Sequence, residues 1–307
     1  MAVNTLTALT NEQKTFYERV LLERLKPNLV FYNYGEKKTI PKNEGLTINF
    51  RRFDALEPNT TALTEGVTPA GKSISVSKVE ATLKQLGDFI TTTDVIDLAA
   101  IDKVVTEMTE VLGEQAGASI DKCVSDVVTK GTNVMYAKGA ATSAIGATDV
   151  VTSTLIKKCV RTLRANNVKP YENGYYIGVI HPNIAYDIMN DPLWEDVSKY
   201  NGGQAIVAGE VGRLAGVKFV ESTYAPIKSG EGASSADVYC SMIFGKGFYA
   251  VPDLDGKAKP EMIVKPLGSA GTADPLDQRA SVGWKAFFTT ARLNELCGIR
   301  LESGATI

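Results

Sequence analysis

The stretch Gly66–Ser73 reads GVTPAGKS and matches the pattern G-x-x-x-x-G-K-[ST] in full. In nucleotide hydrolases a loop of this pattern holds the phosphates with backbone N–H groups, and its lysine reaches the outer phosphates. Lys72 occupies the lysine position. Nucleotide binding and hydrolysis are therefore the first chemistry that the sequence suggests.

A phosphate loop needs a buried strand before it and a helix after it, because the helix N-terminus supplies free N–H groups and a positive dipole end. The segment before Gly66, PNTTALTE, is polar and rich in threonine. The segment ISVSKVEATL after it alternates apolar and polar residues, as a strand does. Both flanks are wrong for a nucleotide hydrolase, which is kept only as a remote alternative.

Few other residues could support catalysis. His181 is the only histidine, and it stands at the end of an expected strand before Pro182, where a structural hydrogen bond is the commoner role. The sequence contains neither a G-x-S-x-G nucleophile elbow nor an H-E-x-x-H zinc motif. Four cysteines are widely spaced, as free thiols in a reducing compartment are: Cys123, Cys159, Cys240 and Cys297. We expect no enzymatic activity, no cofactor and no metal site.

The composition is that of an ordinary globular protein, with 307 residues, 44% of them hydrophobic, and a formal net charge of −2. Neither a secretory signal nor an apolar run long enough to span a membrane is recognisable, so we expect a soluble protein made inside a cell. The charge is nevertheless segregated. Residues 1–52 hold nine Lys/Arg and five Asp/Glu, whereas residues 94–130 hold three and eight. Segments of opposite charge can attract each other across a contact between copies of the chain, although two solvent-exposed charged faces are the simpler interpretation.

The first half of the chain predicts a helix, an arm and a long helix. An amphipathic helix is expected up to about Lys26, and its apolar stripe needs a partner that can be another subunit. Two strands, at residues 46–51 and 74–83, are joined by about twenty residues and form a long arm. A one-residue slip in the second strand, at Ser77–Lys78, predicts a bulge. Residues 94–130 predict one continuous helix, about 55 Å long.

The second half predicts a mixed α/β lobe that begins after a stretch of small residues, 139–148. Helices are expected near residues 155–163 and 183–189, with a buried strand at 175–180 between them. The strands at 238–244 and 247–251 are predicted to form a hairpin, and those at 281–290 and 299–302 to pair last.

Six stretches, taken together, resemble the major capsid protein of tailed bacteriophages, in the branch of large podoviruses of the N-four type. They are spread over most of the length of the chain: ERLKPNLVFYNYGEKKTIPKNEGLTINFRRF (23–53), LTEGVTP (63–69), KQLGDFITTTDVIDL (84–98), GEQAG (113–117), GEVGRLAGVKFVES (209–222) and VKPLGSAGTADPLDQRASVGWKA (264–286). In this family LTEGVTP lies on an extended β-arm, which implies that Lys72 binds no phosphate.

The resemblance implies an α+β fold, the shell fold of tailed phages and herpesviruses. Its parts would be an N-terminal arm (1–35), an extended β-hairpin arm (36–93), a peripheral lobe with a long spine helix (94–140, completed by 255–307) and an axial α/β lobe (141–254).

The function that the resemblance implies is structural. Copies of the chain would self-assemble into the hexamers and pentamers of an icosahedral head in the virion, made and assembled in the host cytoplasm. Packaged double-stranded DNA would be contacted non-specifically at the inner surface, portal and accessory or decoration proteins would be partners, and no membrane would be bound. A cellular nanocompartment shell of the same fold stays open as the alternative.

The residues expected at contacts between subunits fall into three groups. Basic residues of the arm would face acidic residues of a neighbour's spine helix, the tip of the arm would reach a neighbour, and the N-terminal helix would pack on one. These residues are Arg51 and Arg52; Glu107, Glu110 and Glu114; Leu63, Thr64, Glu65 and Gly66; and Phe16 and Val20.

Overall fold

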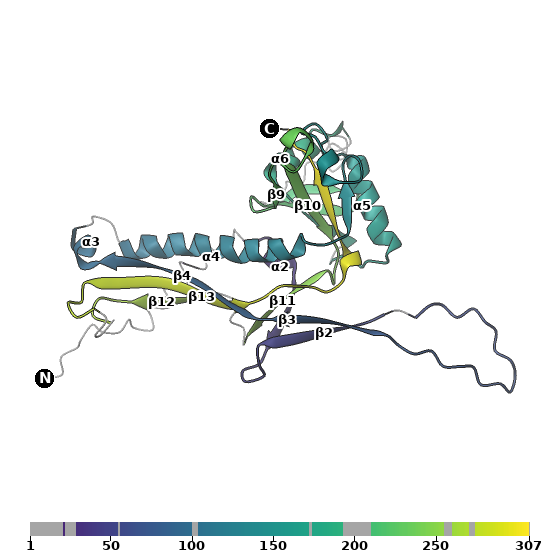
Figure 1. Ribbon diagram of the computed structural model, residues 1–307, viewed down its shortest axis with the longest axis horizontal. Coiled ribbons are helices and arrows are strands. Elements are labelled where there is room, and N and C mark those ends of the chain that lie inside the picture. Colours follow the sequence, from purple (N-terminus) through teal and green to yellow (C-terminus); the bar gives the residue numbers. More distant parts are fainter. Residues whose placement is uncertain are drawn as a thin grey trace.

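The computed structural model describes residues 21, 29–54, 56–99, 104–171, 174–192, 210–254, 260–269 and 274–306. Within these residues the chain forms a six-stranded sheet, a seven-stranded sheet and an isolated two-stranded hairpin. Figure 1 shows the six-stranded sheet beneath a long helix, the seven-stranded sheet in a lobe at one end, and the hairpin extending away from both. The mixed α+β architecture expected from the sequence is confirmed.

The six-stranded sheet has the order β1-β11-β13-β12, with β4 paired to β13 and β14 paired to β11. The ladder between β4 and β13 is ten residues long on each strand and is antiparallel throughout. The strands are β1 (Glu36–Ile40), β4 (Lys84–Thr93), β11 (Tyr249–Leu254), β12 (Glu261–Lys265), β13 (Arg279–Phe288) and β14 (Ala291–Arg292).

The long helix α4 (Val104–Val128) runs along β4 and β13 and covers one face of this sheet (Figure 1). Its buried apolar residues recur every four positions and face the sheet: Leu112, Ala116, Ile120, Val124 and Val128. Trp284 of β13 donates an indole N–H to Gln115 at 3.2 Å, which fixes the helix on the sheet. We refer to α4 as the spine helix.

The seven-stranded sheet has the order β5-β15-β10-β6-β8-β7, with β9 paired to β10. All residues of its two central strands, β6 and β10, are buried, because both faces of the sheet are covered. The strands are β5 (Val134–Tyr136), β6 (Tyr176–Ile180), β7 (Glu210–Leu214), β8 (Val217–Glu221), β9 (Ile227–Lys228), β10 (Val238–Phe244) and β15 (Gly298–Ser303). The helices of this lobe are α5 (Ser153–Ala165) and α6 (Pro182–Met189).

The shorter elements complete the chain. Helix α2 (Phe31–Tyr34) precedes β1, and α3 (Asp94–Ala99) follows β4 directly. Single turns of 3₁₀ helix are η2 (Thr142–Ala144), η4 (Ala233–Ser235) and η6 (Glu295–Cys297). One continuous buried core joins the spine helix, both larger sheets and α5. At the junction of the two sheets, Phe244, Phe248 and Tyr249 pack with ring centroids 5.5–5.7 Å apart.

Several sequence-based predictions about pairing were wrong. β10 and β11 do not form a hairpin, because β10 lies between β6 and β15 while β11 pairs with β1 in the other sheet. The strands β13 and β15, which were expected to pair with each other, also lie in different sheets.

The single helix expected over residues 94–130 is described as two helices, α3 and α4. At 25 residues α4 is about 37 Å long. Residues 100–103 lie outside the described residues.

The predicted bulge at Ser77–Lys78 is also absent. The hairpin of β2 (Thr47–Phe53) and β3 (Val76–Thr82) has a regular antiparallel register from Thr47↔Thr82 to Phe53↔Val76. The apolar pattern slips because Val76 faces outward and is exposed, whereas Val79 and Ala81 are the more covered residues of β3. The slip reflects apolar residues on both faces of the arm and not an extra residue.

Candidate inter-subunit surfaces

The β2–β3 arm is anchored at its root and apolar toward its tip. At the root, Ile48, Ala81 and Leu83 form a small buried cluster with Ile40 and Ala291. Beyond it, Phe53 is 66% exposed. The loop that joins the strands carries four more exposed apolar side chains: Leu56, Leu63, Val67 and Ile74. A two-stranded hairpin is marginally stable alone, and apolar side chains gathered far from their own core are typical of a contact surface.

The loop between β2 and β3 contains Gly66–Ser73, and its structure contradicts a phosphate site. No strand leads into this segment and no helix follows it within the described residues 56–99 before α3. The ammonium group of Lys72 donates to the backbone carbonyl of Glu57 at 3.0 Å, so it fixes the loop. Gly66, with φ +77°, forms a turn closed by a hydrogen bond from Val67 N to Thr64 O at 3.2 Å. The expected contact residues 63–66 are exposed on this turn.

The arginines of the arm occupy different positions from one another. Arg51 and Arg52 are both exposed, but consecutive residues of a strand point to opposite faces. Arg52 donates to Asn294 at 3.1 Å and pairs with Asp54 at 3.3 Å, which directs it back toward its own chain. The side chain of Arg51 therefore lies on the face of the arm opposite to that of Arg52.

The three expected carboxylates of the spine helix share one face. Glu107, Glu110 and Glu114 follow the spacing i, i+3, i+7, so they form one row along α4. Glu107 and Glu114 are exposed and Glu110 is half-buried. The structure thus brings the acidic group together within one subunit. Phe16 and Val20 lie outside the described residues, and Leu21 next to them is fully buried.

A buried carboxylate that the sequence-based analysis missed joins the N-terminal segment to the spine helix. Asp121 is fully buried on α4, and its Oδ1 accepts the N–H of Tyr32 at 2.9 Å. The N–H groups of Val30 and Phe31 lie close enough to favour the charged carboxylate, whereas its Oδ2 has no hydrogen-bond partner among the described residues. These are the N–H groups at the start of α2, so Asp121 caps α2 from another element. The one signal in the sequence is an acidic residue inside the apolar stripe of a helix.

Burial governs the protonation of this junction. It raises the pKa of Asp121 to about 7, although the neighbouring backbone N–H groups and the charge of Lys37 oppose the rise. Burial likewise lowers the pKa of Lys37 to about 8, against the attraction of Asp253 and Asp121. The Lys37 ammonium donates to the carbonyl of Tyr32 and lies 3.1 Å from the centre of its ring. The junction between N-terminal segment and spine helix is therefore sensitive to pH near neutrality.

A second buried carboxylate, Glu302 on β15, holds the other sheet together. Its Oε1 accepts Lys228 at 2.8 Å and Arg300 at 2.7 Å, and its Oε2 accepts the Thr142 hydroxyl at 2.6 Å. Burial would raise the pKa of Glu302, but these hydrogen bonds and the charge of Arg300 outweigh burial and hold the pKa below its ordinary value. The network is structural, because it joins β15 to β9 of the same sheet and to the turn η2 beside it.

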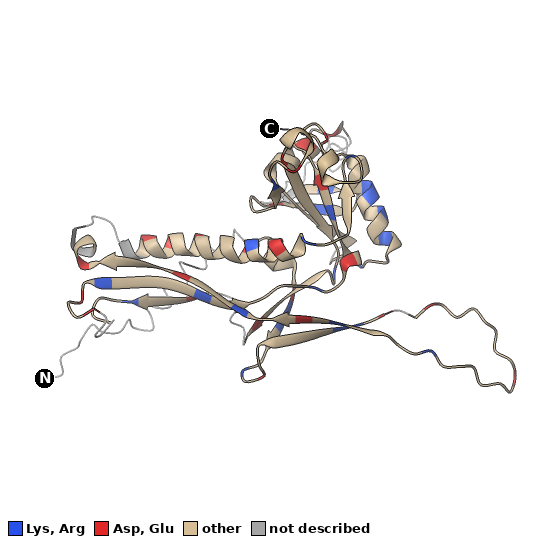
Figure 2. Cartoon of the chain, viewed as in Figure 1, with Lys and Arg blue, Asp and Glu red and all other residues tan. Residues whose placement is uncertain are grey.

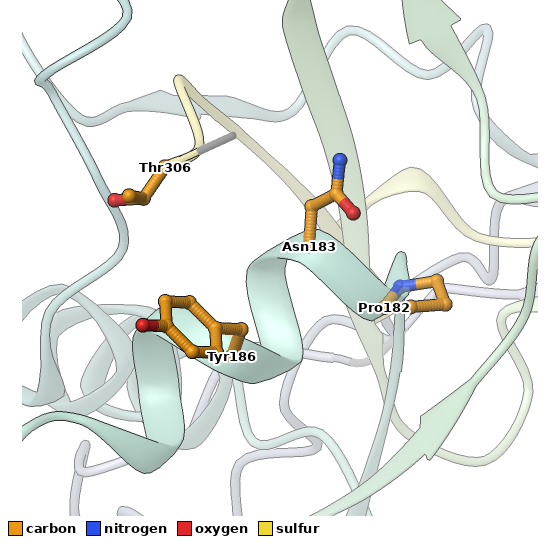
Figure 3. A pocket seen from close by; sticks show the side chains of 4 residues that line it. All are labelled: Pro182, Asn183, Tyr186 and Thr306. Carbon is orange, nitrogen blue, oxygen red and sulfur yellow. The ribbon is translucent and has the colours of Figure 1, made fainter.

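His181, the only histidine in the sequence, has a structural role. His181 caps α6, where its Nδ1 accepts the N–H of Asn183 at 3.2 Å, and its ring packs against Tyr239. The predicted hydrogen-bonding role is confirmed. Beside it lies a hollow of about 450 Å³. Figure 3 shows four described residues that line it, Pro182, Asn183, Tyr186 and Thr306, and the groups that these four offer are amide and hydroxyl groups.

The described residues also bear on metal sites and on membrane-spanning helices. No cluster of three or more acidic, histidine or cysteine side chains suited to a metal ion occurs among them. None of the helices described is both long and apolar enough to cross a bilayer. The free thiols of Cys159, Cys240 and Cys297 are buried, as expected, whereas Cys123 is exposed on α4.

Comparisons with known proteins agree with this architecture. The structure is similar to the capsid of Ralstonia phage GP4, with a TM-score of 0.71 and 12% identity over 91% of this chain and 92% of that chain. It is also similar to the capsid of cyanophage P-SCSP1u (TM-score 0.68, 17% identity, 91% and 89%) and to that of cyanophage Pam1 (0.67, 15%, 99% and 96%). A search of curated proteins gave no match. The family model described as phage capsid protein matches residues 75–301, which is most of the sequence. The chain belongs to the phage capsid protein family.

Proposed function

We propose that copies of this chain close into hexamers and pentamers that build an icosahedral phage head around double-stranded DNA. Membership of the phage capsid protein family makes the chain a structural protein of the phage capsid. The observation that best supports self-assembly through arms is the β2–β3 arm, which extends beyond both lobes in Figure 1 and carries exposed apolar side chains.

The arm suits assembly for a physical reason. Its backbone and apolar side chains gain no core from their own subunit, so covering them by a neighbour removes apolar area from water at about 25 cal/mol per Å². Each contact is small, but a subunit in a closed shell makes several at once, and linked contacts strengthen one another. A shell built in this way is stable although each pairwise contact is weak.

We assign the parts of the chain to roles in the shell as follows. Residues 1–35 are the N-terminal arm and 36–93 contain the β-arm. The six-stranded sheet with the spine helix forms the peripheral lobe, and the seven-stranded sheet with α5 and α6 forms the axial lobe. Because β4 and β11 are strands of the six-stranded sheet, we assign them to the peripheral lobe. Because β15 is a strand of the seven-stranded sheet, we assign it to the axial lobe.

Electron microscopy of the purified protein tests the proposed function directly. Closed particles of uniform size support a shell subunit. Protein that stays monomeric under all assembly conditions would sink the proposal. DNA inside particles isolated from infected cells separates a phage head from a cellular nanocompartment, which is the alternative that family membership disfavours.

Contacts between the arm and a neighbour's spine helix are a second part of the proposal. Arg51 of the arm would face the acidic row Glu107, Glu110 and Glu114 of a neighbour. Arg52 would join this contact once its ion pair with Asp54 is broken. Reversing both arginines to glutamate should impair assembly at low salt, where exposed charges are least screened. Reversing the helix carboxylates as well should restore part of it. Normal particle yield from the arginine variant would exclude this pairing.

The remaining roles follow from a capsid function. Portal and accessory or decoration proteins would bind the assembled shell, and assembly would take place in the host cytoplasm. The chain would have no enzymatic activity, so ATP turnover should be absent in the wild type and in Lys72→Ala alike. A rate that falls with Lys72→Ala would restore the nucleotide hydrolase alternative.

A further inference from the structure

The outer face of α5 carries four exposed basic side chains and no acidic one. Lys157, Lys158, Arg161 and Arg164 are all exposed there, and Figure 2 shows them as a blue row on this helix. Residues 150–171 contain five basic residues and no acidic one, in a protein with a net charge of −2. We call these four side chains the α5 basic face.

The four residues form a compact row. Lys157, Arg161 and Arg164 have the spacing i, i+4, i+7, which places them on one side of the helix over about 10 Å, with Lys158 beside them. The opposite side of the helix is buried in the core by Ile156, Cys159, Val160 and Leu163. The row therefore cannot turn inward, and it faces solvent in the single subunit.

The basic character continues past the end of the helix. The guanidinium of Arg164 lies against Gly216 in the turn between β7 and β8. A Cβ atom added to Gly216 would be 3.3 Å from Nη2 of this arginine. Lys169 follows the helix, and its carbonyl accepts the N–H of Lys246 at 2.9 Å, so these two exposed lysines stand on adjacent backbones.

None of the four side chains forms an ion pair with any carboxylate of the described residues. Like charges at i, i+4, such as Lys157 and Arg161, cost a helix a few tenths of a kcal/mol. A row of cations without a carboxylate partner among the described residues is complementary in charge to an anionic partner outside the subunit.

The chemistry of the face favours a phosphate polymer over a protein. The core of a stable protein interface is apolar and depleted in charge, whereas α5 exposes no large apolar side chain. Phosphate backbones are bound by lysine and arginine alone, without sequence reading. The helix has no aromatic residue on which a single-stranded base could stack, so duplex is the better match.

We propose that the α5 basic face binds the phosphate backbone of duplex DNA on the inner side of the shell. This inference rests on the proposed function, which places the DNA inside. Many weak, sequence-independent contacts, one set per subunit, would hold the outer layer of DNA without fixing its sequence.

The salt dependence gives the expected size of the effect. Four phosphate contacts predict that log K falls with log salt with a slope of about −3.6, at about 0.9 for each contact. Removing two contacts should flatten the slope by about 1.8. The same relation predicts a loss of affinity of about 60-fold at 0.1 M salt.

Fluorescence anisotropy of a labelled 20-base-pair duplex with the unassembled subunit tests the inference, over a series of salt concentrations. The test variant is Lys157→Glu/Arg161→Glu. The matched control, Lys84→Glu/Lys130→Glu, makes the same change of charge at exposed lysines on β4 and at the end of α4. A conservative variant, Lys157→Arg/Arg161→Lys, keeps the charge. Circular dichroism verifies that each variant is folded.

The inference predicts that the test variant loses at least about 60-fold in affinity at 0.1 M salt and that its salt slope flattens by at least about 1.8, because the glutamates add repulsion to the two lost contacts. The control and conservative variants should stay within about threefold of the wild-type affinity. It is overturned if the wild type does not bind the duplex at low salt, or if test and control variants weaken binding equally. It is also overturned if the test variant binds DNA normally but no longer forms shells, because α5 would then be a contact between copies. Shell formation is scored separately by electron microscopy, so failure of the proposed function and failure of this inference give different results.

Discussion

Replacing Asp121 by asparagine should stabilise the subunit at neutral pH, and the gain should grow between pH 5 and pH 7. The wild-type carboxyl is buried against the start of α2, where its pKa is raised to about 7 from an ordinary value of 3.8. As the pH rises, the unfolded chain loses this proton first, so the unfolded state is favoured. The contribution of Asp121 is therefore complete below pH 3.8 and is lost as the pH approaches 7.

The size of the effect follows from the two pKa values. Linkage gives a loss of unfolding free energy of roughly 2 kcal/mol by pH 5 and roughly 4 kcal/mol by pH 7, relative to the protonated group. The difference between pH 5 and pH 7 is roughly 2 kcal/mol, which corresponds to a change in melting temperature on the order of 5 °C. Asparagine keeps an acceptor oxygen for the N–H of Tyr32 and does not titrate.

The assay is thermal unfolding of unassembled wild type and Asp121→Asn at pH 5, 6 and 7. The measured quantity is the difference in melting temperature between the two proteins at each pH, because other titrating groups then cancel. Glu107→Gln, which removes an exposed carboxylate from the same helix, is the control, and the gain between pH 5 and pH 7 should be larger for Asp121→Asn. A difference for Asp121→Asn that is constant or shrinks from pH 5 to pH 7 would refute the reasoning.

Two further predictions concern the packing of the lobes. Glu302→Ala should lower the free energy of unfolding by about 3–5 kcal/mol, because the largely buried Arg300 loses its counter-charge and Lys228 keeps only Glu231, 3.8 Å away, among the described residues; a loss below about 1 kcal/mol in urea unfolding would contradict this. Gly298→Ala should cost about 1–3 kcal/mol, since a Cβ there would lie 2.4 Å from the ring of Phe248. Gly71→Ala, where a Cβ would meet nothing within 4 Å, is the matched control, and equal unfolding midpoints for the two alanine variants would exclude the packing argument.

Local patterns in the sequence predicted many of the elements, and the resemblance predicted how they are arranged. The alternation at residues 46–51 and 74–83 predicted the strands of the arm, because one face of each strand is covered at the root. The same local reading rejected the GVTPAGKS phosphate loop, and the structure places that segment in the joining loop of the arm. The role of His181 followed from its position before a proline at a strand end, and the structure confirms it.

The pairing of distant strands could not be predicted from local patterns. The strands β10 and β11 are separated by a short Gly-Lys-Gly link that is typical of a hairpin, yet the chain crosses there from one sheet to the other. Gly245 in this link is packed so closely that a Cβ would lie 2.5 Å from Val168. Such a crossing is decided by tertiary packing, as is the capping of α2 by Asp121, 89 positions after Tyr32.

The central claim is that the exposed β2–β3 arm joins subunits into a closed shell. Negative-stain electron microscopy of a variant lacking residues 63–72, compared with the wild type at equal protein concentration, tests it most directly. Because this segment makes no contact with the buried core, we expect the variant to stay folded but to yield no stable closed particles. Closed particles of normal size and yield from the deletion variant would contradict the account.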